Sequence, residues 1–144
     1  MKLKGLFLVL LLLATACKKE EAEIVCEGSF KGKDQAGTKH CVQGEWDITF
    51  AEGGSLSGPT ALTNTYINIT ATDSIYYWKK GQPTAADKIV WKTETNFISE
   101  TFNVMTFSGT PGTDYSWVID GIYSSKLKVI DNTQGFIYTM ERKD

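Results

Sequence analysis

The chain has 144 residues, with 15 basic and 17 acidic side chains and a formal net charge of −2. That length accommodates one domain with a sizeable core and a short extension. Because there is no basic excess, the composition gives no electrostatic support to nucleic-acid binding, and no nucleic-acid partner is predicted.

The first 16 residues have the composition of an export signal peptide. Lys2 and Lys4 supply a positive start, residues 6–13 are apolar, and residues 14–16 are the small residues of a cleavage site. The apolar run is shorter than the roughly 18 residues that cross a bilayer, so a permanent transmembrane helix is not predicted. Removing this signal peptide changes the formal net charge from −2 to about −4.

Cys17 follows the small residues directly, and this arrangement resembles the leader of bacterial lipoproteins. In that family the cysteine is acylated on sulfur with chains such as palmitate, and the leader is cut before it. The resemblance implies that Cys17 anchors the mature protein to a membrane, because two or three acyl chains hold firmly. A plain secretory signal with an unmodified cysteine is the alternative.

Residues 18–21, Lys-Lys-Glu-Glu, form a charge cluster that is too polar to pack. The cluster resembles the signal with which lipoproteins of Bacteroidetes-type bacteria reach the outer face of the outer membrane. The resemblance implies an outer-membrane location with exposure at the cell surface. A periplasm-facing position is the alternative.

Two further cysteines follow the charge cluster. With Cys17 lipidated, Cys26 and Cys41 form an even pair in an oxidising compartment. A disulfide between them would close a loop of about 15 residues and contribute roughly 3 kcal/mol to stability. Metal binding by Cys41 and the adjacent His40 is the alternative, but neighbours in an extended chain point apart, so no metal site is predicted. Residues 17–42 are thus expected to hold the lipidated cysteine, a flexible tether and this loop.

From Gly44 onward, period-two alternation broken by turn residues predicts strands, and no segment shows sustained helical periodicity. Strands are expected within residues 46–50, 65–70, 75–78, 88–95, 96–107, 115–120, 124–130 and 136–140. Loops are expected at residues 52–59, 79–83, 108–112 and 131–135. Roughly eight strands in chain order predict an all-β antiparallel meander that closes as a β-barrel, with a β-sandwich as the alternative.

The barrel pattern resembles the lipocalin-like domains of bacterial lipoproteins. Those domains open on a Gly-x-Trp strand, which matches Gly44-Glu45-Trp46, and close on a strand that ends in an aromatic and a basic residue, which matches residues 138–143. The resemblance implies a lipocalin-like β-barrel domain over residues 43–144.

No catalytic constellation is recognisable, so an enzyme is not predicted and no cofactor is expected. His40, the single histidine, lies beside the predicted disulfide rather than next to a nucleophile. The acidic residues near strands show no spacing that selects a catalytic pair.

Aromatic side chains are the candidates for ligand contact, and the six that we single out are Trp46, Tyr77, Trp91, Tyr115, Trp117 and Tyr138. They would line a pocket for a small apolar or amphipathic ligand, or they would simply fill the interior of a small barrel. Tyr76 and Trp78 alternate to the opposite face from Tyr77 and would form a contact surface. The sequence therefore predicts a ligand-binding lipoprotein, with a structural module that contacts another envelope protein as the alternative.

Asp73-Ser74-Ile75 resembles the Asp-Ser/Thr-aliphatic site at which Bacteroidetes-type bacteria O-glycosylate exported proteins. The resemblance implies that Ser74 is a glycosylation site in an accessible turn. An unmodified turn serine is the alternative.

Overall fold

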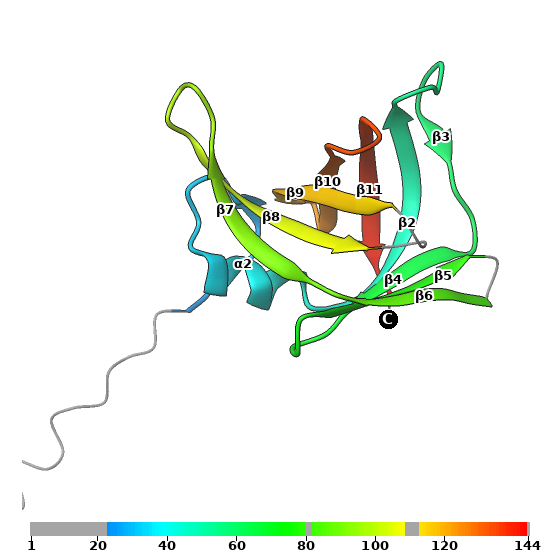
Figure 1. Ribbon diagram of the computed structural model, residues 1–144, viewed down its shortest axis with the longest axis horizontal. Helices are drawn as coiled ribbons and strands as arrows, with labels where there is room; N and C mark the ends of the chain where they lie inside the picture. The colour runs from blue at the N-terminus through cyan, green and yellow to red at the C-terminus, as the bar shows by residue number, and fades with distance from the viewer. Residues whose placement is uncertain (1–22, 80–81, 109–112, 144) are drawn as a thin grey trace, which may run out of the picture.

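A computed structural model describes residues 23–79, 82–108 and 113–143 of the chain (Figure 1). The predicted leader, Cys17 and the charge cluster lie outside these residues, as does most of the turn expected at 108–112. Among the described residues, no helix combines the length and the apolar character needed to cross a membrane.

The described chain consists of one short helix and eleven strands. In chain order they are β1 (Gly28–Ser29), α2 (Gln35–Val42), β2 (Gly44–Gly53), β3 (Thr60–Ala61), β4 (Thr65–Ile69), β5 (Ser74–Lys79), β6 (Gln82–Lys88), β7 (Val90–Thr95), β8 (Thr101–Ser108), β9 (Asp114–Tyr123), β10 (Lys126–Asp131) and β11 (Phe136–Arg142).

The strands form one antiparallel sheet in the order β6-β5-β4-β2-β11-β10-β9-β8-β7, with β1 added to β9 and β3 added to β2. Because β2 pairs with the last strand, β11, the meander curls round on itself. Only Ile89 separates β6 from β7, and its amide donates to the carbonyl of Asp73 at 2.8 Å. The predicted all-β antiparallel barrel is confirmed, as a nearly closed barrel rather than a sandwich (Figure 1).

Strand alternation fills the barrel interior as the period-two pattern predicts. The fully buried aliphatic side chains come from strands all round the barrel; they include Ile67, Ile69, Ile75, Ile119, Leu127, Val129 and Met140. Their outward neighbours, such as Lys128 and Thr139, are more exposed. Burying one face of each strand fixes the strand register, because a slip of one residue would expose the whole apolar set.

Four elements were not expected from the sequence: the two-residue strands β1 and β3, strand β6 and helix α2. β6 begins at Gln82, inside the expected loop, and Pro83 is tolerated there because it pairs beside a register shift between Tyr77 and Trp78. Helix α2 lies within the disulfide loop, where no helix is expected from periodicity. Asp34 caps it by accepting a hydrogen bond from the amide of Gly37 at 2.7 Å.

Helix α2 packs against one end of the barrel, which we call the helix end. The predicted disulfide between Cys26 and Cys41 is present and ties the last turn of α2 to the N-terminal segment. Inside, the Asn103 side chain donates to the hydroxyl of Thr38 at 2.7 Å and to the carbonyl of Lys33 at 2.8 Å. These contacts position a helix that is too short to be stable alone.

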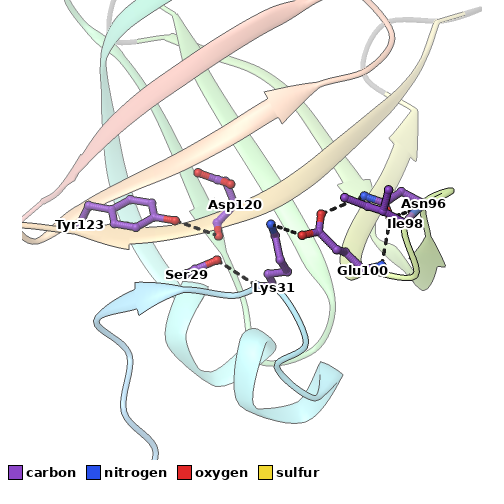
Figure 2. Close-up of polar contacts among 7 residues, drawn as sticks. All are labelled: Ser29, Lys31, Asn96, Ile98, Glu100, Asp120 and Tyr123. Atoms are coloured by element: carbon purple, nitrogen blue, oxygen red, sulfur yellow. Dashed lines mark hydrogen bonds and ion pairs between the residues drawn. The ribbon is translucent and has the colours of Figure 1, made fainter.

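The segment before α2 also lies against the barrel (Figure 2). The amide of Phe30 donates to the carbonyl of Asp120 at 2.8 Å, and Lys31 forms an ion pair with Glu100 at 2.7 Å. Hydrogen bonds from Lys31 and Asn96 lower the pKa of Glu100. The N-terminal segment therefore joins β9 to the β7–β8 hairpin.

Candidate functional site

Six aromatic side chains meet at the end of the barrel opposite α2, which we call the open end. There β2 finishes at Gly53 opposite Phe136, the first residue of β11. The members of this aromatic cluster are Tyr77, Phe107, Tyr115, Trp117, Phe136 and Tyr138, and the centroids of contacting rings are 5.0 to 6.4 Å apart. Period-two alternation on four strands, β5, β8, β9 and β11, points these rings inward.

A hollow of about 300 Å³ opens to solvent beside this cluster, and we call it the aromatic hollow. It is lined by Ile48, Leu62, Thr65, Tyr66, Tyr77, Trp78, Tyr115, Trp117, Gln134 and Tyr138. Four of the six residues predicted to contact a ligand, Tyr77, Tyr115, Trp117 and Tyr138, thus come together on one hollow. Its volume is at the lower end of the range for small-molecule sites.

The other two predicted residues, Trp46 and Trp91, lie at the helix end instead. Trp46 is 1% exposed, and its indole N–H donates to the carbonyl of Val42 at 2.8 Å. The indole of Trp91 donates to the carboxylate of Asp73 at 2.9 Å, and the same carboxylate pairs with Lys39 of α2 at 3.1 Å. Both tryptophans therefore hold α2 in place, and neither is among the residues that line the aromatic hollow.

Arg142 completes the helix end by satisfying carbonyls at the C-terminus of α2. Its guanidinium donates to the carbonyl oxygens of Cys41 at 3.0 Å and Gln43 at 2.9 Å, and it lies 4.2 Å from the centroid of Trp46. A cation at this position also complements the negative end of the helix dipole. Gly44, with φ of 116°, allows the sharp entry into β2, and a Cβ there would be 2.7 Å from Arg142.

Two polar atoms at the open end are buried and have no hydrogen-bond partner among the described residues. They are the indole nitrogen of Trp117 and one carboxylate oxygen, Oδ2, of Asp131. Asp131 is fully buried and lies opposite Trp117 in the pairing of β10 with β9. Its other oxygen, Oδ1, accepts from the amides of Thr133 at 2.8 Å and Gln134 at 3.2 Å. An unsatisfied buried polar group lowers the stability of the folded protein. Packing of the barrel alone therefore does not explain the two unpartnered atoms of Trp117 and Asp131.

Sequence reasoning missed Asp131, because Asp-Asn-Thr-Gln-Gly is also the chemistry of a hairpin loop. A usable signal was present. The alternation that begins with Leu127 and Val129 continues to position 131 and points that carboxylate inward.

Burial and nearby acidic groups act on two tyrosines at the open end. Burial raises the pKa of Tyr77, and the charge of Asp87, the neighbouring Tyr115 and the charge of Asp131 add to the shift. Burial also raises the pKa of Tyr138 to about 12, again with a contribution from Asp131. Both phenols are therefore neutral at physiological pH and contribute uncharged rings to the aromatic hollow.

Ser74 and His40 lie away from the aromatic hollow. Ser74 is the first residue of β5 and is half-buried, and its amide donates to the hydroxyl of Thr70 at 3.1 Å. His40 is exposed in the last turn of α2. The glycosylation of Ser74 stays a prediction.

Comparison of the chain with protein-family models, with curated proteins and with solved structures finds no significant match.

Proposed function

We propose that this chain is a membrane-anchored lipoprotein whose β-barrel binds a small apolar or amphipathic ligand in the aromatic hollow. The observation that carries the proposal is the hollow itself. Rings that only fill a core pack against each other on all sides, whereas Tyr115 and Tyr138 border open space. Trp117 also lines the hollow, and its indole N–H has no hydrogen-bond partner among the described residues.

The lipocalin-like resemblance gains support from the way its two motifs meet. Trp46 of the Gly-x-Trp motif lies opposite Arg142 of the closing strand in the pairing of β2 with β11. The guanidinium lies over the indole ring, at a distance typical of a cation–π contact. We keep the lipocalin-like assignment as part of the proposal.

Filling the hollow should abolish ligand binding. In Thr65→Trp, a residue that lines the hollow gains a large ring, which would occupy the space that the ligand needs. The matched control is Thr60→Trp, which adds the same ring at an exposed position on β3. Native mass spectrometry of residues 23–144, purified from the natural host, should show a bound small molecule in the parent and control proteins but not in Thr65→Trp. The proposal would be contradicted if no small molecule were bound to any of the three proteins, or if Thr65→Trp retained the bound molecule.

The membrane anchor is inferred from the leader sequence, and the position of the N-terminal segment would then set the orientation of the barrel. The described chain begins on the side of the barrel where α2 lies (Figure 1). An acyl anchor six residues before Glu23 would therefore tether the helix end, and the open end would be free to meet solvent. We infer an outer-membrane protein exposed at the cell surface, with a periplasm-facing position as the alternative.

Cys17→Ser should release the protein from membranes, because the acyl chains would be lost. Fractionation should find the variant in the soluble fraction, and metabolic labelling with palmitate should fail. The control is the double variant Cys26→Ser and Cys41→Ser, which removes two cysteines, leaves no unpaired partner thiol and keeps the acylation site. Continued membrane retention or palmitate labelling of Cys17→Ser would contradict the lipid anchor at Cys17.

A second candidate is an interaction module that contacts another envelope protein, and the β7–β8 hairpin favours it. Phe97 is 97% exposed and Ile98 is 58% exposed at its tip. The tip is rigid, because the side-chain oxygen of Asn96 accepts from the amides of Ile98 at 3.1 Å and Glu100 at 2.9 Å (Figure 2). A shallow groove of about 290 Å³ adjoins the hairpin and is lined by residues that include Phe102, Val118 and Ile130. Exposed apolar side chains beside a partly apolar groove are typical of a contact site.

Replacing Phe97 and Ile98 by serine should abolish that contact and change stability by less than about 0.5 kcal/mol, because both side chains are exposed. Crosslinking in intact cells would measure the contact. Phe50→Ser, at an exposed aromatic residue on β2, is the control. An unchanged crosslinking pattern would exclude the hairpin as the contact site.

A further inference from the structure

The buried carboxylate of Asp131 has no ionic partner among the described residues. The ion pairs of the described chain involve other carboxylates, and every residue that lines the aromatic hollow is uncharged. An isolated buried charge is expensive, so a purely structural role would favour a neutral side chain here.

The hairpin that follows β10 does not require this charge. The amides of Thr133 and Gln134 need one acceptor oxygen, and Asp131 supplies it with Oδ1. Asparagine would supply the same acceptor in the same turn without burying a negative charge. The charge and the free Oδ2 of Asp131 therefore remain to be explained.

Asp131 lies beside the aromatic hollow, because its partner in the pairing of β10 with β9 is Trp117, a lining residue. The carboxylate contributes to the raised pKa values of Tyr77 and Tyr138, and both residues line the hollow. Asp131 itself lies behind the lining, next to Trp117 in the sheet. Its effect on a molecule in the hollow would be electrostatic, exerted through the ring layer rather than by direct contact.

We propose that the aromatic hollow selects a small organic cation of the ammonium type, held over the rings of Trp117, Tyr115 and Tyr138 and favoured by the buried charge of Asp131. The proposal rests on the proposed ligand-binding function and names its ligand class. Aromatic faces attract cations through their quadrupoles, and the attraction grows where water is excluded. A metal ion would instead need several oxygen ligands, whereas the lining consists mainly of rings and aliphatic groups.

The test compares choline with dimethylbutanol, in which carbon replaces the charged nitrogen at nearly constant shape. Isothermal titration calorimetry would use the full-length protein in non-ionic detergent micelles. We expect choline to bind at least about tenfold more tightly than dimethylbutanol. In Asp131→Asn, which keeps the turn acceptor, choline affinity should fall by about tenfold while dimethylbutanol affinity changes by less than about twofold. Ultraviolet titration of the variant should show a lower pKa for Tyr138 than the parent's value of about 12, because a nearby negative charge is removed.

The outcomes separate the two proposals. Equal affinity for both probes would overturn cation selection but leave ligand binding in the hollow intact. Binding of neither probe would overturn cation selection, whereas ligand binding in the hollow is decided by the native mass spectrometry described above. Unchanged choline affinity in Asp131→Asn would show that Asp131 has only its turn-capping role. If that variant does not fold, the comparison of the two probes on the unaltered protein still decides the preference.

Discussion

Replacing Cys26 and Cys41 together by serine should lower the free energy of unfolding by about 3 kcal/mol. The disulfide closes a loop whose ends are 15 residues apart, and opening it restores conformational freedom to the unfolded chain. The double substitution avoids a reactive single thiol. Urea denaturation, followed by tryptophan fluorescence, would measure the difference.

The loss should be concentrated at the helix end. Helix α2 has eight residues, which is below the length at which isolated helices are stable in water. Its remaining attachments are the Asp34 cap and individual side-chain contacts, which come from Asn103, Trp46, Arg142 and the Trp91–Asp73–Lys39 group. Hydrogen exchange in α2 should accelerate more than exchange in β9 or β10. Chemical reduction of the parent protein is the control and should reproduce the same loss. A loss below about 1 kcal/mol would mean that packing alone holds the segment.

Most of the barrel was predictable, because burying one face of a strand imposes period-two alternation on the sequence. Trp46-Asp47-Ile48 and Lys126-Leu127-Lys128-Val129 show that alternation clearly, and both lie in strands. β6 was not recognisable, because Gln-Pro-Thr-Ala-Ala-Asp-Lys offers little apolar contrast and contains a proline. Helix α2 was missed for a related reason. Eight residues span barely two turns, and only its cap and its buried side chains distinguish it from a loop.

The candidate site was also predictable in part, because strand alternation determines which side chains point inward. Alternation places Tyr77, Trp117 and Tyr138 inside the barrel, but it does not say at which end. Their height along the barrel depends on register, and register shifts occur between Lys128 and Val129 and between Thr139 and Met140. The sequence could therefore not separate the tryptophans that hold α2 from the rings that line the hollow.

Trp46→Ala should destabilise the protein by about 3 to 5 kcal/mol, the largest effect that we expect from one substitution. The side chain is fully buried, so its removal would leave a cavity that the neighbouring strands cannot close. It would also leave the carbonyl of Val42 without the indole donor and remove the ring beneath Arg142. Thermal and urea unfolding would measure the loss. Trp46→Phe is the matched control; it keeps a ring and loses the donor, so about 1 to 2 kcal/mol is expected.

The informative comparison is with Tyr115→Ala at the other end of the barrel. Tyr115 is half-buried and borders the aromatic hollow, so its loss should cost much less stability than that of Trp46. Ligand binding should respond in the opposite way: it should weaken in Tyr115→Ala and persist in Trp46→Phe, which folds but changes only the helix end. If binding weakened equally in both, the two ends would not be functionally separate. If Tyr115→Ala lost as much stability as Trp46→Ala but kept full ligand binding, the rings of the open end would serve only to fill the core. The two readouts together therefore decide whether the aromatic residues of this barrel have one role or two.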